Sequence, residues 1–142
     1  MKFFLPVLFT LMSLAFNAPA NEADAADARI SLGFTESEKA AFLSEMRQML
    51  VSIQGVISSI GTNDRELIVR SARYSGNRMA RETPIAIKKK TPPEFKELGA
   101  PTHMMFEELV VRAEEDDPES LTAFTGELMK QCIACHAMFR AD

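Results

Sequence analysis

Residues 35–60 read TESEKAAFLSEMRQMLVSIQGVISSI and carry a long amphipathic pattern. The stretch opens with Thr35-Glu36-Ser37-Glu38, a capping box in which a hydroxyl and a carboxylate satisfy each other's backbone amides. Apolar residues then recur at spacings of four and three, as in a helix with one buried face: Phe42, Met46, Met49, Ile53, Val56 and Ile60. The pattern predicts one long helix that must bury this face against partners.

Signals for three more helices follow the first one. Gly61 is expected to end the first helix, and Asn63 or Asp64 to cap the second. The face of the second helix is mostly small, with Leu67, Ile68, Ala72, Gly76 and Met79. Three prolines in residues 81–93 predict a connector with at most one short helical turn.

The last two helices lie on either side of an Asp-Pro pair. The third gathers Phe95, Leu98, Met105, Phe106, Leu109 and Val110, with a break or kink expected at residues 99–101. Asp117 caps the fourth, Pro118 occupies its first turn, and the helix is expected to continue to the end of the chain. Four amphipathic helices without a strand pattern predict an all-α fold, an antiparallel four-helix bundle.

Composition narrows the function classes. The chain has 142 residues, 46% of them apolar, which suits one small domain. Sixteen basic against 20 acidic residues give a net charge of −4, which argues against nucleic-acid partners. The sequence has no phosphate-binding glycine loop, nucleophile elbow or carboxylate-histidine metal motif, so we expect no enzyme apart from what a cofactor could supply.

The N-terminus has the features of a secretory signal. Lys2 precedes an apolar run over residues 3–16, and Ala18-Pro19-Ala20 supplies the small residues of a cleavage site. The run is too short for the ~20 residues of a membrane-spanning helix. We therefore expect a signal peptide over residues 1–20, a flexible leader over 21–34, and a helical domain over 35–142 that is exported and soluble.

The chemistry lies in Cys132-Ile133-Ala134-Cys135-His136, which holds both cysteines of the chain. On a helix, the two thiols and the imidazole project from one face, where the thiols can bond covalently to a haem and the imidazole can reach its iron. A redox disulfide is the first alternative, but that use belongs with a cysteine at a helix start. A zinc site needs about four ligands, and His103 is the one further histidine. The motif predicts one haem c per chain.

The closing stretch from Leu128 to Arg140 resembles the C-terminal helix of class II c-type cytochromes, the cytochrome c′ family. Outside this stretch the resemblance rests on the helical pattern from about Thr35 onward. It implies a haem between the helices, with His136 as proximal ligand and the sixth iron position facing the first helix. Relatives commonly dimerise through their first two helices, so a homodimer stays open.

The residue at the sixth position decides the function that this resemblance implies. Low-spin relatives place a methionine there about four turns before the first interhelical turn, which fits Met46 better than Met49. High-spin relatives place a non-ligating apolar residue there and bind small gases such as nitric oxide or carbon monoxide. His103 would give a bis-histidine haem, and Met46 could simply be a core residue. We expect His136 and Met46 to ligate the iron of a periplasmic electron carrier.

Several basic residues also have expected roles. Arg140 matches the basic residue that the family carries one turn after the histidine, and it could also pair with the helix C-terminus. Arg47 could meet a haem propionate. Lys88, Lys89 and Lys90 form a solvated run or a docking patch for an acidic redox protein.

The expected partners are periplasmic redox proteins and the cytochrome c maturation machinery. A helical interaction protein with a disulfide and no haem is a third alternative.

Overall fold

The computed structural model describes residues 27–142, so the predicted signal peptide (1–20) and the first part of the leader lie outside the described residues. Within them the fold is all-α, as predicted, apart from one two-residue strand pair. The helices are α1 (Glu36–Thr62), α2 (Arg65–Tyr74), α3 (Asn77–Glu82), α4 (Ile85–Lys90), α5 (Pro93–Glu115) and α6 (Pro118–Met138). None of these helices is long and apolar enough to cross a membrane.

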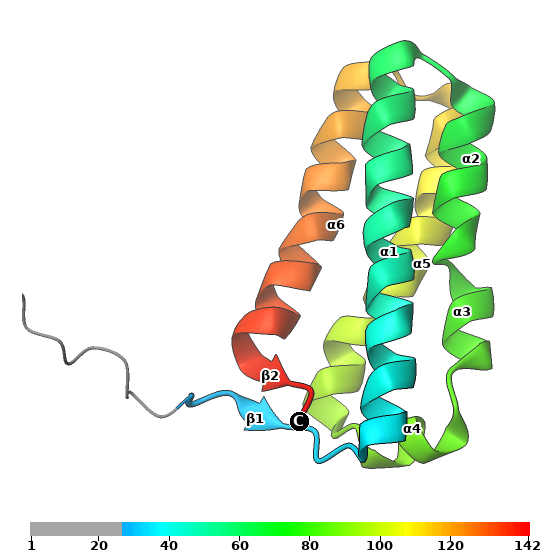
Figure 1. Cartoon of the computed structure of the whole chain (residues 1–142). Coiled ribbons are helices and arrows are strands. Elements are labelled where there is room, and N and C mark those ends of the chain that lie inside the picture. Colours follow the sequence, from blue (N-terminus) through cyan, green and yellow to red (C-terminus); the bar gives the residue numbers. More distant parts are fainter. Residues whose placement is uncertain (1–26) are drawn as a thin grey trace, which may run out of the picture.

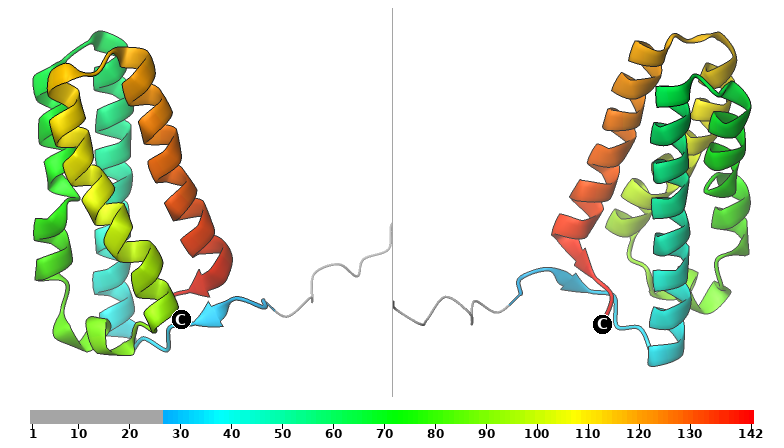
Figure 2. Two further views of the ribbon diagram at one scale, coloured as in Figure 1. Left: turned by 180° about the vertical axis from the view of Figure 1, so that it is seen from behind. Right: turned by 45° about the horizontal axis from the view of Figure 1, so that its top comes forward.

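The long helices lie side by side and alternate in direction (Figures 1 and 2). In the view of Figure 1, α1 runs from the lower end to the upper end, α2 and α3 return, α5 rises behind them and α6 descends. The helices are close together at the upper end, whereas α6 diverges from α1 toward the lower end. The second half of α6 is therefore farther from α1 than its first half.

The first helix begins as predicted and ends later than predicted. Glu38 N–H donates to Thr35 Oγ1 at 3.4 Å and Thr35 N–H donates to Glu38 Oε2 at 2.8 Å, which completes the capping box. Gly61 does not terminate the helix: α1 continues to Thr62, and Asn63 adopts the left-handed conformation with φ 55°. Asn tolerates this region better than other non-glycine residues. Asp64 caps α2 as predicted, accepting from Leu67 N–H at 2.9 Å.

The predicted second helix is divided into α2 and α3. Gly76 is the N-cap of α3, and a Cβ at this position would collide with the Glu107 carboxylate. That carboxylate accepts a hydrogen bond from Asn77 N–H at 2.7 Å, so a side chain of α5 supplies the cap that α3 lacks locally. The sequence could not predict this break, because it depends on a residue 30 positions away.

Two further expectations about the helices are corrected. Residues 81–93 are more helical than predicted, because α4 forms directly after Pro84 and ends before Pro92. A break or kink was expected at residues 99–101; the break does not occur, since α5 continues through Pro101 and Thr102 Oγ1 donates to Leu98 O within the helix.

The chain end and the leader pair with each other, which the sequence did not predict. α6 ends at Met138, and Phe139–Arg140 (β2) pair in parallel with Ile30–Ser31 (β1). Leu32 and Phe34, assigned from the sequence to a flexible leader, are buried against Phe139. The leader expectation is therefore wrong for residues 30–34, and the fourth helix is shorter than predicted.

The apolar core has two parts. The upper core holds the interhelical contacts of α1, α2, α5 and α6 and includes Val56, Ile68, Phe106, Leu109 and Leu128, each no more than 1% exposed. The lower cluster consists of Leu32, Phe34, Phe42, Ile87 and Phe139, with Met46, Phe95 and Cys135 packed against it. The space between α1 and α6 lies beside the lower cluster.

Candidate functional site

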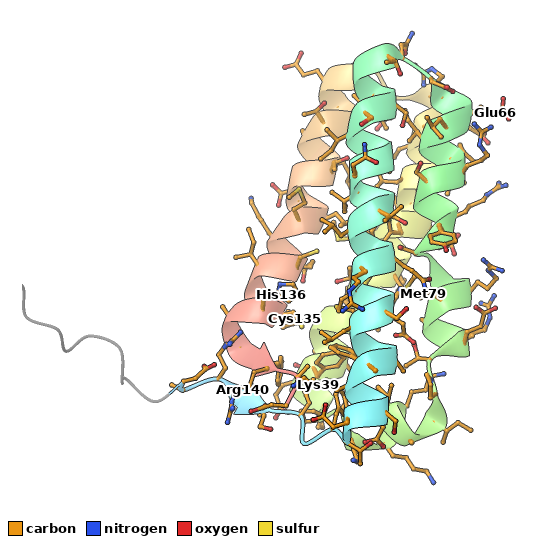
Figure 3. The ribbon with its side chains drawn as sticks, viewed as in Figure 1. Lys39, Glu66, Met79, Cys135, His136 and Arg140 are labelled. Carbon is orange, nitrogen blue, oxygen red and sulfur yellow. The ribbon has the colours of Figure 1, made fainter. Side chains whose placement is uncertain are left out.

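The functional side chains lie on the second half of α6. Asp117 accepts from Ser120 N–H at 2.8 Å at the start of this helix, and Leu121, Thr125 and Leu128 bury its first half. Cys132, Cys135 and His136 follow on the part that diverges from α1, and Figure 3 shows Cys135 and His136 beside the space between the two helices. The upper core therefore anchors α6 while its last turns are left open to a ligand.

A larger cavity of about 730 Å³ lies between α1, α5, α6 and the α3–α4 segment. Cys132, Cys135 and His136 line it from α6, and Met46 and Met49 line it from α1. Its volume falls within the ~300–1,000 Å³ of small-molecule and cofactor sites. Protein interiors are otherwise close-packed, with few voids larger than a water molecule. Its size and lining make this cavity the candidate ligand site.

A smaller cavity of about 510 Å³ lies at the lower end, next to the larger one. Phe42, Met46, Phe95, Cys135 and His136 line both cavities. Arg29, Leu32 and Asp27 line the smaller cavity from the N-terminal segment, and Lys39 and Arg140 add two further basic groups. His136 thus lies between two cavities, one mainly apolar and one with charged groups at its rim.

The two cysteines are half-buried free thiols. Burial raises the pKa of the Cys132 thiol, and burial together with the neighbouring Cys132 raises the pKa of the Cys135 thiol. Reactive cysteines of disulfide exchange have lowered pKa values, usually at a helix N-terminus, whereas these thiols lie near the C-terminal end of α6. The environment therefore does not favour the redox-disulfide alternative.

Met46 and Met49 have different surroundings. Met46 packs against the lower cluster together with Cys135 and lines both cavities. Met49 packs against the upper core with Cys132 and lines only the larger of the two cavities. Both thioethers are half-buried, so both are available to a ligand between α1 and α6. Met46 is the α1 methionine that shares two cavities with His136.

His103 also lines the larger cavity, from α5. Its Nδ1 lies 2.7 Å from Ser75 O, and because a carbonyl only accepts, Nδ1 is the donor. Ser75 is itself buried, and its hydroxyl lies 2.7 Å from the Ser52 hydroxyl. The ring of His103 is therefore oriented by a network that links α1, α2 and α5.

Glu45 is a cavity residue that the sequence analysis did not identify. It accepts a hydrogen bond from Thr83 Oγ1 at 3.1 Å, and both residues line the larger cavity. Burial raises the pKa of Glu45, opposed by the Thr83 hydrogen bond and by His103 and Lys88. In the sequence, Glu45 is a polar residue beside the apolar stripe of α1, and no pattern marks it as a cavity residue.

The expected basic residues have mixed outcomes. Arg140 lines the smaller cavity but lies in β2 and not on a helical turn; it pairs with Asp142 and donates to Arg29 O at 3.2 Å. Arg47 is exposed and lines neither cavity.

The lysine run does not form one uncommitted patch. Lys88 donates to Arg81 O at 2.8 Å, and Lys90 pairs with Glu38 at 2.5 Å.

Within residues 27–142, no three His, Cys, Asp or Glu side chains gather closely enough to hold a metal ion by themselves. The chemistry of the site therefore rests on a two-thiol, one-imidazole set and the methionines opposite. Comparison of the chain with family models, with curated proteins and with solved structures finds no match. The resemblance to class II cytochromes thus rests on the residues of the chain itself.

Proposed function

We propose that the protein is a periplasmic monohaem c-type cytochrome that carries single electrons between redox partners. In this proposal the helices form an antiparallel four-helix bundle of the cytochrome c′ type. Cys132 and Cys135 hold the haem covalently, His136 is the proximal ligand of the iron and Met46 is the distal one. The cytochrome c maturation machinery would attach the haem after export.

One observation carries the proposal: both cysteines, His136 and Met46 line one cavity of about 730 Å³ between α1 and α6. Two thiols and an imidazole come from one helix, and a thioether comes from the helix opposite. This donor set matches covalent haem attachment with His/Met ligation. The apolar lining from Phe42, Ile53 and Phe95 suits the faces of a flat aromatic ring system.

The bound haem would supply one-electron redox chemistry at its iron. As iron ligands, His136 and Met46 would both be uncharged, and a thioether stabilises ferrous over ferric iron better than a second imidazole would. Together with the apolar wall, they favour a higher reduction potential than two histidines would give. These properties suit an electron carrier.

The first test asks whether the haem is present. The full chain is produced with its own N-terminus in a strain competent in cytochrome maturation, and the periplasmic protein is extracted with acid-acetone. Protein that stays red and carries a porphyrin adduct in its mass spectrum supports the proposal. Colourless protein with the mass of the bare polypeptide contradicts it.

The second test assigns the distal ligand from the visible spectrum. We expect a low-spin spectrum that Met46→Ala converts to high-spin. Met49→Ala is the matched control, because Met49 is a half-buried methionine one turn after Met46 and lines only the larger cavity. A low-spin spectrum that survives Met46→Ala but is lost in Met49→Ala or His103→Ala overturns the assignment. A high-spin spectrum in the unmodified protein favours the five-coordinate, gas-binding alternative.

A further inference from the structure

Residues 27–34, here called the strap, run along the chain segment that follows His136. Leu32 N–H donates to Arg140 O at 3.0 Å and Phe34 N–H donates to Asp142 O at 3.2 Å, continuing the β1–β2 pairing. Leu32 and Phe34 are 5% and 7% exposed, so they are anchored in the lower cluster. The strap is thus bound by backbone pairing on one side and by apolar burial on the other.

The strap also reaches the backbone of His136 itself. Arg29 Nη1 donates to His136 O at 3.2 Å, while the remaining guanidinium nitrogens bind Asp27, with Arg29 Nη2 and Asp27 Oδ2 2.6 Å apart. The last four carbonyl groups of a helix have no partner within the helix. In α6 the carbonyl of His136 is one of them, and Arg29 supplies its partner from a segment 107 positions away in the chain.

Few other contacts hold the last turns of α6. Ile133 and Met138 are 66% and 42% exposed, and the two cavities adjoin Cys135 and His136. Cys135 and Phe139 pack in the lower cluster, where the ring centroids of Phe139 and Phe95 lie 5.4 Å apart, and the strap pairs with the segment that follows the helix. A helix end with so little packing frays readily unless its carbonyls are bound.

We propose that the strap positions His136. Arg29 and the β1–β2 pairing fix the end of α6, and they thereby fix the backbone from which the His136 side chain extends toward the two cavities. This inference rests on the proposed function, in which the strap would hold the proximal ligand of the haem iron in one place. Arg29 is a positioning residue, because it acts on the backbone of His136 and not on the ligand.

The test uses the full matured protein and four variants. Arg29→Ala removes the bond to His136 O, and Arg29→Lys keeps a cation that can still donate to it. Leu32→Ala weakens the anchor of the whole strap. Arg78→Ala is the control, because Arg78 is an exposed arginine on α3, away from the strap (Figure 1). Amide hydrogen exchange is followed at Phe139, whose N–H donates to Cys135 O, and at Leu32 and Phe34.

We expect Arg29→Ala to speed exchange at Phe139 about tenfold, as the loss of one charge-assisted hydrogen bond allows. Arg29→Lys should recover most of the protection, and Leu32→Ala should speed exchange at all three amides. In the haem-loaded protein, the visible spectrum and reduction potential should shift in Arg29→Ala and not in Arg78→Ala. The proposal is overturned if Phe139 exchanges equally fast in Arg29→Ala and Arg78→Ala, or if the spectrum and potential of these two variants agree.

The exchange arm does not depend on the haem. If mass spectrometry finds no porphyrin adduct, the proposed function fails, while the exchange rates at Phe139 still decide whether Arg29 fixes the end of α6. If the adduct is present and the exchange rates do not differ, the strap inference fails and the proposed function stands.

Discussion

Leu128→Ala is the substitution that best tests how α6 is held. The Leu128 side chain is 0% exposed, belongs to the upper core and lies one turn before Cys132. Truncating a buried leucine costs the transfer free energy of the lost methyl groups plus a cavity term, about 2–5 kcal/mol together. Because Leu128 is fully buried among the residues of the upper core, we expect a loss of about 3 kcal/mol.

The measurement is thermal unfolding of the matured protein, followed by circular dichroism. For a domain of roughly this size, 1 kcal/mol corresponds to about 4 °C, so Leu128→Ala should lower the Tm by roughly 12 °C. Ile133→Ala is the matched control on the same helix, because Ile133 is 66% exposed. It should change the stability by no more than about 0.5 kcal/mol.

Equal Tm values for Leu128→Ala and Ile133→Ala would refute the reasoning. They would mean that the first half of α6 is not packed into the upper core, and that the orientation of Cys132, Cys135 and His136 is set in another way. A larger loss in Ile133→Ala would mean that α6 presents the opposite face to α1.

Two further predictions concern a turn and a pH dependence. Asn63→Val should destabilise by about 1–2 kcal/mol in urea unfolding, because Asn63 has φ 55° and a β-branched residue is strained there; Asn63→Gly should be neutral to within a few tenths, and equal losses in both would count against the left-handed turn. The hydrogen bond from Lys90 and those from Thr35 lower the pKa of Glu38 to about 2, so the stability it contributes is complete above its ordinary pKa of 4.5 and is lost as pH falls toward 2. In urea titrations the difference between the protein and Lys90→Ala should therefore shrink across that window, and a constant difference would contradict the pairing.

Local signals in the sequence predicted much of the fold. The capping box at Thr35, the Asp64 cap and the Asp117-Pro118 start are made by residues within a few positions of each other, and each occurs where expected. The apolar stripe of α1 also predicted four of its buried residues, Phe42, Ile53, Val56 and Ile60, because a helical repeat fixes which side chains share a face. Met46 and Met49 of the same stripe are half-buried, and the buried Ser52 and Ser59 were not predicted. The spacing of Cys132, Cys135 and His136 likewise fixed that they share one side of α6.

Features that depend on residues far apart in the chain could not be predicted from the sequence. The break at Gly76 depends on Glu107, the order of the strap depends on Phe139 and Asp142, and the polar wall of the larger cavity depends on Glu45 meeting Thr83. Met46 and Met49 are equivalent in the helical pattern. They differ because α6 diverges from α1 below the upper core and leaves Met46 beside both cavities.

The sequence by itself thus determined the helical elements, their buried faces and the set of donor atoms on α6. The tertiary structure alone decided which side chains face that set, where the cavities lie and what holds the last turn of α6. The physical reason is range: caps and helical faces arise from hydrogen bonds and spacings within a few residues. The packing of α6 and of the strap depends on contacts between separate elements, such as that of Arg29 with His136, which lie 107 positions apart.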